Sequence, residues 1–351
     1  MSATAGPGQA SFCVLHGSPA GLIEARWRTF LSACDVATHY VAPEYFLEPG
    51  LRGKKPFALL SLEGEQITGI LTGIHDGDRV QSGLSVRPQV ALLRAADRAR
   101  AMSNLVAGLG REAQSATLVD VYGWLGTADA LDARFCTRRY EGVVMLDLRR
   151  GPQALFARFS ENKRTNIKKA VKLGVSVDVA EDPEDIAAYH AVYVQWSRRK
   201  ALPTVAEDVF QETFALTANR RLFLARHAGH VIAGVVVRFC PGGMMEYAAN
   251  SSRESALHLR PNDLLHWRAI EWGCAEGLSN YSLGGAHLFL RKFGGEVIPT
   301  IRHRLDRSPF RRHTLSDWVA DRAQSARRCV PRPVVAVGRK LRSRLERLCG
   351  A

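Results

Sequence analysis

Two segments of the sequence resemble each other, and this repeat constrains the fold more than any other feature. Residues 57–74 read FALLSLEGEQITGILTGI, and residues 222–239 read LFLARHAGHVIAGVVVRF. Each consists of two β-rich runs around a turn that contains glycine, which is the pattern of a β-hairpin. The spacing G-x-x-I-x-G begins at Gly64 in the first segment and at Gly229 in the second. The sequence therefore predicts two related hairpins, one in each half.

Similar elements flank the two hairpins. An amphipathic helix is expected before each one, at residues 21–34 and 185–200. An Arg-Pro pair and a second helix are expected after each one, at residues 87–102 and 260–277, because proline suits the first turn of a helix. A short strand follows in each half, at residues 117–124 and 280–285.

This order predicts one α/β unit used twice. The fold class is α/β (α+β), with two tandem domains whose mixed sheets are flanked by helices, and the element order is that of an N-acyltransferase fold. Units of about 150 residues match the usual domain size. We expect a first domain at residues 1–150, a second at 151–308 with its seam at Gly151-Pro152, and a basic helical tail at 309–351.

Positive charge is unevenly distributed. The net charge is +14, and residues 302–351 alone carry 14 Lys or Arg against 4 Asp or Glu. Cations also crowd the predicted helix ENKRTNIKKAVKLG at residues 161–174. Such a balance favours phosphorylated substrates, nucleic acid or anionic lipid as partners.

The last predicted helix, GRKLRSRLERLC at residues 338–349, sets one leucine stripe among five cations. It is suited to an anionic membrane surface or to nucleic acid. The alternative is a terminal helix that packs on its own domain.

The seven cysteines are scattered and form no C-x-x-C pair. This pattern argues against a disulfide framework and against a zinc site, so no metal is expected. No signal peptide is recognisable, and no apolar run approaches the roughly 20 residues that a membrane span needs. We therefore expect a cytoplasmic protein that contacts the inner membrane, if at all, from its surface.

Several segments, in order, resemble the FemAB-like transferases, which are tandem relatives of the Gcn5-type N-acetyltransferase (GNAT) fold. The segments are YEGVVMLDL (140–148), LFARFSENKRTNIKKAVKLGVSVDV (155–179), MEYAANSS (245–252), RPNDLLHWRAIEWGCAEGLSNYSLGG (260–285) and RKFGGE (291–296). The resemblance covers roughly residues 130–300. It implies transfer of an acyl or aminoacyl group to an amine, with acyl-CoA or aminoacyl-tRNA as donor. Some members add amino acids from charged tRNA to cell-wall peptide precursors.

Two departures from the family pattern weaken the inference to a peptidoglycan-bridge enzyme. The chain has no long heptad-patterned insertion, and the family's Phe-Lys pair reads Phe289-Leu290 here, with Arg291 and Lys292 shifted toward Phe293-Gly294. The transferase class does not depend on either feature.

The GNAT resemblance places the reaction centre where two central strands separate, here residues 245–251 and 280–285. Glu246 is a candidate general base and Tyr247 a candidate acid or substrate contact. Strand alternation puts these two side chains on opposite faces of the sheet. Backbone N–H groups near residues 248–251 are candidate oxyanion donors.

Other candidates would bind the substrates. The cations Lys163, Arg164, Lys168 and Lys169 are expected to grip a phosphorylated substrate. Residues expected on the acyl-donor side are Asn262, at the start of a helix suited to a phosphate, and Gly284, Gly285 and Lys292. His258 and His266 are expected to be structural or exposed.

The first hypothesis is a cytoplasmic N-acyltransferase of FemAB-like type. It would act on a phosphorylated or lipid-linked precursor of the cell envelope. Its expected partners are a small-molecule or lipid-linked acceptor, tRNA, and an anionic membrane that the basic tail would contact. The second is an acetyl-CoA-dependent N-acetyltransferase acting on a soluble small molecule. The third is a non-catalytic nucleic-acid-binding protein, against which the tail counts because its cations are not interleaved with aromatic residues.

Overall fold

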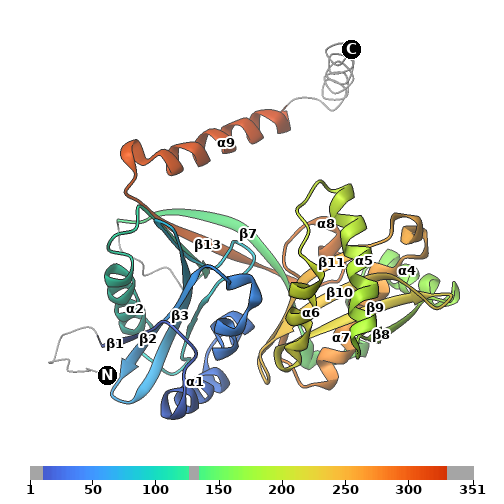
Figure 1. The fold of residues 1–351 in the computed structure, drawn as a ribbon, viewed down its shortest axis with the longest axis horizontal. Coiled ribbons are helices and arrows are strands. Elements are labelled where there is room, and N and C mark those ends of the chain that lie inside the picture. Colours follow the sequence, from blue (N-terminus) through green and yellow to red (C-terminus); the bar gives the residue numbers. More distant parts are fainter. Residues whose placement is uncertain (1–10, 126–133, 330–351) are drawn as a thin grey trace.

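The computed structural model of this 351-residue chain describes residues 11–125 and 134–329. In these residues thirteen strands form one continuous mixed sheet, with helices on both faces (Figure 1). The strand order is β1-β2-β3-β4-β6-β13-β7-β12-β11-β10-β9-β8, and β5 pairs with β3 off this path. The expected α/β architecture is confirmed.

The first half contributes seven strands and two long helices among the described residues. These are β1 (Phe12–Leu15), α1 (Gly21–Ala33), β2 (Lys55–Glu63), β3 (Gln66–Asp76), β4 (Arg79–Ser82), β5 (Val90–Leu92), α2 (Arg98–Glu112), β6 (Leu118–Trp124) and β7 (Cys136–Asp147). Short 3₁₀ turns connect α1 to β2 and end the half: η1 (His39–Val41), η2 (Pro43–Leu47), η3 (Pro49–Leu51) and η4 (Leu148–Arg150).

The second half repeats this order with additional helices. Its elements are α3 (Pro152–Arg158), α4 (Glu161–Lys172), β8 (Ser176–Val179), α5 (Pro183–Arg199), α6 (Glu207–Ala215), η5 (Thr217–Asn219), β9 (Arg220–His227), β10 (His230–Phe239), β11 (Met244–Ser252), η6 (Glu254–Leu259), α7 (Pro261–Ala275), β12 (Asn280–Ser282), α8 (Leu288–Arg291), β13 (Glu296–Asp306), η7 (Pro309–Arg311) and α9 (Arg312–Cys329). Across residues 11–125 and 134–329, each helix is too short or too polar to span a bilayer.

Both predicted hairpins are present, as β2–β3 and β9–β10. Each is closed by a two-residue turn that needs positive φ, which glycine adopts without strain. Gly64 supplies it in the first hairpin at φ 57°, and Gly229 in the second at φ 78°. The second glycine of the motif gives room for packing: a Cβ on Gly234 would lie 2.6 Å from the ring of Tyr189.

One predicted helix is partly wrong. Residues 87–102 were expected to be helical, but Val90–Leu92 form strand β5 against β3, and the helix begins only at Arg98. All four residues of the run VALL are apolar, so the run has no polar-apolar period that could distinguish a buried strand from a buried helix. Asp97 sets the true start, because its side chain accepts a hydrogen bond from the backbone N–H of Arg100.

The last strand of each half crosses to the other half. β7 follows β6 in the chain but pairs with β12, and β13 follows β12 but pairs with β6. The two crossing strands also pair with each other, antiparallel, along most of their length. Backbone hydrogen bonds therefore run unbroken from one half to the other, and both strands span the gap between them in Figure 1.

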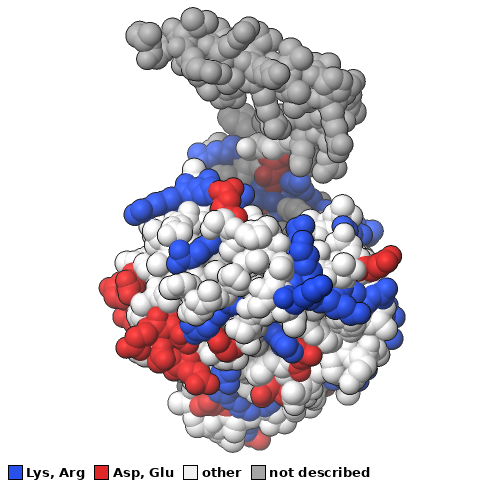
Figure 2. Space-filling view, turned by 90° about the vertical axis from the view of Figure 1, so that its right-hand side faces the viewer, with Lys and Arg blue, Asp and Glu red and all other residues white. Residues whose placement is uncertain are grey.

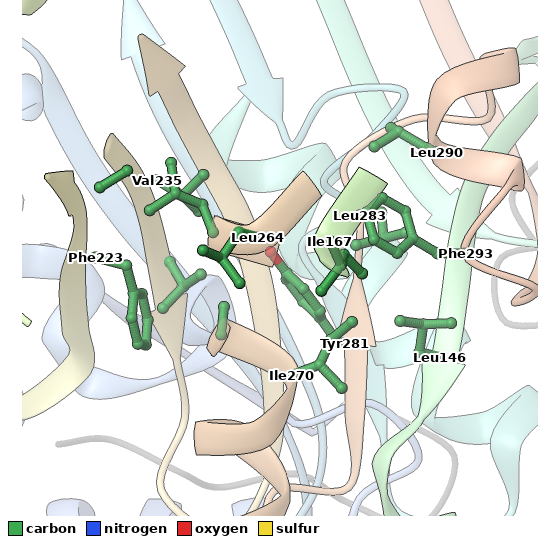
Figure 3. Packing of buried hydrophobic residues seen from close by; sticks show 14 of the residues in the cluster. Leu146, Ile167, Phe223, Val235, Leu264, Ile270, Tyr281, Leu283, Leu290 and Phe293 are labelled. Atoms are coloured by element: carbon green, nitrogen blue, oxygen red, sulfur yellow. The ribbon is translucent and has the colours of Figure 1, made fainter. Parts of the chain in front are cut away.

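The largest core cluster lies in the second half, where α4 and α7 cover one face of the sheet. Figure 3 shows Tyr281 of β12 lying among Leu264, Ile167 and Ile270. Side chains of this kind contribute about 1.5–3 kcal/mol each when fully buried. α5 and α6 cover the opposite face of the same strands through a separate cluster that contains Tyr189 and Phe214. The first half has one cluster under α1 and another under α2.

The basic segment at residues 161–174 is a helix, as predicted. Ser160 caps α4 by accepting a hydrogen bond from the N–H of Lys163, and Gly174 ends it at φ 78°. The expected amphipathic helix at residues 338–349 lies outside the described residues.

Candidate active site

Strands β11 and β12 run parallel and then separate. Residues Met244 to Glu246 pair with Asn280 to Ser282, and the pairing stops there. Just beyond this point β11 has a bulge: Tyr247 faces Val237 of β10 and Ala249 faces Val236, so Ala248 is the extra residue. The expected pair of separating strands is confirmed, and the bulge lies at the point of separation.

One face of this point is lined by aromatic side chains. The ring of Tyr247 lies 5.2 Å from that of His266 on α7, and Nδ1 of His266 lies 3.1 Å from the hydroxyl of Tyr281. Gly284 has φ 70°, and a Cβ there would lie 2.9 Å from Tyr247 Cδ1. A larger residue at position 284 would therefore displace the Tyr247 ring.

Beneath these rings lies a buried ion pair between α4 and α7. The Lys163 ammonium pairs with the carboxylate of Asp263, whose second oxygen accepts a hydrogen bond from Asn166 Nδ2 at 3.0 Å. Lys163 Nζ also lies 3.1 Å from the centroid of the Phe289 ring and 4.1 Å from that of Phe293. The Lys163 side chain is only 2% exposed, so its charge is held by one carboxylate and two aromatic faces.

The environment shifts the pKa values of three groups on this face. Burial and, to a smaller extent, the charge of Lys292 lower the pKa of Lys163 to about 8, although the charge and hydrogen bond of Asp263 oppose the shift. Burial, together with the charges of Lys163 and His287, lowers the pKa of His266 to about 3. Burial raises the pKa of Tyr247. At neutral pH the imidazole is therefore uncharged and the Tyr247 phenol keeps its proton.

Glu246 lies on the opposite face of β11. Its side chain is buried, and among the described residues no side chain donates a hydrogen bond to its carboxylate. Burial raises the pKa of Glu246 to about 7, although the charges of Arg87 and Arg238 oppose the shift. A carboxylate with this pKa can accept a proton near neutral pH.

Arg87 connects the first half to the bulge. It lies between β4 and β5, and its Nη2 donates to the carbonyl oxygen of Ala248 at 2.6 Å. Because that carbonyl belongs to the bulge residue, the contact sets the local direction of the β11 backbone. A side chain 161 residues away in sequence thus shapes the point where the strands separate.

A pocket of about 360 Å³ adjoins this face. It lies between the first half and β10, and both polar and apolar residues line it. Its charged residues are three cations, Lys54, Arg87 and Arg238, and one carboxylate, Glu48, so the lining carries a net positive charge. The pocket is therefore suited to an anionic group.

A buried ion network holds Arg238 at the pocket. Glu48 accepts from Arg238 Nη2 at 2.9 Å and pairs with Arg220, and its carboxylate lies 2.7 Å from His39 Nε2. Burial alone would raise the pKa of Glu48, yet the hydrogen bond to His39 and the charges of Arg238 and Arg220 lower it to about 2. Glu48 is therefore ionised at neutral pH, and it fixes β10 against the first half.

The four predicted phosphate-binding cations occupy different environments. Lys163 points inward to Asp263, whereas Lys168 and Lys169 are exposed on α4. Arg164 is half-buried and donates to the carbonyl oxygen of Ala157 at 2.9 Å. Figure 2, which faces the end of the molecule that carries α4 and α5, shows Asp and Glu concentrated at the lower left, whereas Lys and Arg are spread over the right and the upper part.

The predicted donor-side residues all lie around the separating strands. The Asn262 side-chain oxygen accepts from Asn250 Nδ2 at 3.1 Å and from Ser252 Oγ at 2.7 Å, which ties the start of α7 to β11. The Gly285 carbonyl accepts from the N–H of Val144 on β7. The Lys292 carbonyl accepts from the N–H of Ser160, and its charge acts on Lys163.

Asp263, His266 and Arg87 lie at the candidate site but were not expected there from the sequence. Asp263 follows Asn262 in the first turn of a helix, where aspartate is common, so nothing distinguished it. His266 was expected to be structural or exposed, and it is buried beside Tyr247. Arg87 had one signal, the Arg-Pro pair that also occurs at Arg260-Pro261. No three His, Cys, Asp or Glu side chains in the described part of the chain cluster as a metal site.

Comparison with known proteins agrees with this geometry. Residues 157–292 match the model of the acetyltransferase (GNAT) domain. A search of the curated proteins found no match. FemX superposes with a TM-score of 0.61 at 10% identity, over 84% of this chain and 97% of FemX.

Two further solved structures share the architecture. The C-terminal domain of a putative lysylphosphatidylglycerol synthetase from Agrobacterium fabrum has a TM-score of 0.58 at 12% identity, over 84% of this chain and 95% of that domain. L-PGS from Bacillus licheniformis has a TM-score of 0.52 at 11% identity, over 84% of this chain and 93% of that chain. Residues 157–292 thus match a GNAT domain, and the chain as a whole shares its fold with FemX and with the lysylphosphatidylglycerol synthetase domain.

Proposed function

We propose that the chain transfers an acyl or aminoacyl group from acyl-CoA or aminoacyl-tRNA to the amine of a phosphorylated or lipid-linked precursor of the cell envelope. One observation carries the proposal. Where β11 and β12 separate, Glu246 is a buried carboxylate with a pKa of about 7, and the two arginines whose charges act on it, Arg87 and Arg238, line the neighbouring pocket. Similarity to FemX and to lysylphosphatidylglycerol synthetase supports the same class of acceptor.

The two faces of β11 would receive the two substrates. The acceptor would enter the pocket, with its phosphate near Arg87, Arg238 and Lys54. The donor would lie on the other face, beside Tyr247 and the Lys163–Asp263 pair, with Asn262, Gly284, Gly285 and Lys292 around it. The exposed lysines of α4 and Arg164 would contact further phosphates of a polyanionic substrate. The reacting atoms would meet where the strands separate, so that positioning supplies much of the acceleration.

Glu246 would be the base and Tyr247 the acid of the reaction, on opposite faces of β11. The amine nitrogen attacks the acyl carbonyl carbon, a C–N bond forms, and the C–S bond of a thioester or the C–O bond of an aminoacyl ester breaks. Glu246 takes the proton that the nitrogen loses, and Tyr247 gives a proton to the leaving thiolate or alkoxide. Backbone N–H groups near the bulge would stabilise the oxyanion. Tyr247 keeps its proton at neutral pH because its pKa is raised.

The donor can be identified with the full chain. Thermal unfolding is measured with acetyl-CoA, free CoA and aminoacyl-tRNA in turn, because a ligand that binds only the folded state raises Tm. Transfer of label from each donor to amine acceptors, with and without a phosphate, is then measured. Acetyl-CoA as the productive donor would favour acetylation of a small amine, to which the GNAT domain match also points. Absence of transfer from every donor class to every amine would refute the proposal.

Two substitutions separate the roles. Glu246→Gln should lower kcat about 100-fold, the scale of general-base catalysis, and should abolish the rise of activity through pH 7. Lys54→Met should raise KM for a phosphorylated acceptor roughly tenfold, because one charged hydrogen bond is lost, and should leave KM for an unphosphorylated amine unchanged. Arg111→Met, an exposed change on α2, is the control. Equal effects of Lys54→Met on both acceptors would contradict the assignment of the pocket.

A further inference from the structure

Helix α9 is attached to the body through its polar side chains. The Asp317 carboxylate lies 2.6 Å from Arg302 Nη2 and 3.0 Å from Arg304 Nη1, both on β13. Thr314 donates to Asp306 Oδ2 from its N–H at 2.8 Å and from its hydroxyl at 3.0 Å. These contacts hold the first turns of α9 in one orientation on the sheet.

The apolar side chains of α9 point the other way. Leu315, Trp318 and Val319 have the i, i+3, i+4 spacing of one helix face, and they are 54%, 56% and 54% exposed. Phe310, just before the helix, is 97% exposed. We call these four residues the α9 apolar face. A surface helix normally turns its apolar stripe to the core, so the orientation of α9 is reversed.

The shape of the molecule leaves this face accessible. Figure 1 shows α9 running outside the body of the two halves, beyond the edge where β13 and β7 cross. A cluster of large apolar side chains exposed in this way marks a contact with another molecule or with a membrane. The charge around it decides between these two.

Cations surround the α9 apolar face. Arg311, Arg312 and Arg322 are all exposed, and the guanidinium of Arg322 lies 4.9 Å from the centroid of the Trp318 ring. The sequence that follows, residues 330–351, adds six Lys or Arg and one Glu. Aromatic and aliphatic side chains bordered by arginine are typical of helices that lie in the interface of an anionic bilayer. Trp318 suits the headgroup level, where tryptophan is enriched.

We propose that the α9 apolar face inserts into the surface of an anionic phospholipid membrane, with Arg311, Arg312 and Arg322 at the level of the phosphates. The contacts of Asp317 and Thr314 with β13 would then set the orientation of the rest of the protein relative to the membrane. This interaction is independent of the acyl transfer proposed above, because none of these residues lies at the separating strands.

The test uses the full chain and vesicles of phosphatidylcholine with or without phosphatidylglycerol. Cosedimentation should show binding only with phosphatidylglycerol. Leu315→Ser/Trp318→Ser/Val319→Ser should weaken it at least tenfold, and Arg311→Gln or Arg312→Gln about fivefold each. Leu22→Ser/Leu47→Ser/Leu202→Ser, three exposed leucines elsewhere, is the matched control and should bind like the unmodified chain. The basic residues 330–351 are present in every variant, so a loss in the triple variant is assigned to α9.

A second readout locates the contact. Bromolipids quench tryptophans that enter the bilayer, so quenching should be seen in the unmodified chain and lost in Trp318→Phe, which still binds. Thermal unfolding should show an unchanged Tm for the serine variants, since the replaced side chains are exposed. Binding of the triple variant equal to that of the unmodified chain would overturn the proposal, as would equal quenching in Trp318→Phe. A dimer that dissociates in the triple variant, without vesicle binding, would overturn it in favour of a second copy of the chain.

Discussion

Glu246→Gln should make the stability of the protein less sensitive to pH. In the folded chain the Glu246 pKa is about 7, against 4.5 for an unperturbed glutamate. Between these values the native state binds more protons than the unfolded state. The stabilising contribution of Glu246 is therefore fully present below pH 4.5 and is lost as the pH rises through 7.

The magnitude follows from the size of the shift. Each pKa unit corresponds to 1.36 kcal/mol, so the full difference is roughly 3 kcal/mol. The free energy of unfolding of Glu246→Gln, minus that of the unmodified chain, should grow by about this amount from pH 4.5 to pH 8. Glutamine has the same shape and no charge, so the cost of burying the carboxylate disappears from the variant.

Urea unfolding at a series of pH values provides the measurement. Glu254→Gln, whose side chain is 73% exposed, serves as the control and should show a difference independent of pH to within about 0.5 kcal/mol. A flat difference for Glu246→Gln as well would refute the reasoning. It would mean that Arg87 and Arg238 stabilise the carboxylate enough to cancel the effect of burial.

Two further predictions concern stability. Asp263→Asn should lower the free energy of unfolding by about 3 kcal/mol, because the charge of Lys163 is left buried without a partner. The double variant Lys163→Met/Asp263→Leu should recover most of the lost free energy in urea unfolding. Equal losses in the two variants would contradict a role for the unpaired charge. Gly142→Ala should cost at least about 2 kcal/mol, because Gly142 has φ 85° and a Cβ there would lie 1.9 Å from the Ile298 carbonyl oxygen. Gly110→Ala, in the α2 interior with open space around it, should instead raise Tm slightly, and a loss at Gly110 as large as that at Gly142 would disprove the steric account.

Much of the local structure could be predicted because it depends on residues close in sequence. The hairpins follow from β-rich runs around Gly64 and Gly229, and α4 follows from the cap at Ser160 and the stop at Gly174. The opposite orientation of Glu246 and Tyr247 follows from strand alternation alone. The wrong helix prediction at residues 87–102 shows the limit of local patterns, since the four apolar residues VALL fit a buried strand as well as a buried helix.

The site itself depends on contacts that no local pattern contains. Lys163 and Asp263 are separated by 100 residues and meet only because α4 packs on α7. The cationic helix suggested a surface that binds phosphate, yet one of its cations points inward, because helical geometry directs every third or fourth side chain to the core. The raised pKa of Glu246 likewise arises from burial in the folded chain, which outweighs the charges of Arg87 and Arg238.

The sequence alone determined that two similar α/β units follow each other, where their hairpins turn, and that Glu246 and Tyr247 lie on opposite faces of one strand, because short-range periodicity and turn chemistry decide these features. Only the tertiary structure decided that β7 and β13 exchange between the halves, that Arg87 fixes the bulge at Ala248, and that α9 turns its apolar face to solvent. These features depend on which surfaces meet after the chain has folded. Packing, hydrogen bonding and desolvation between distant residues set that outcome.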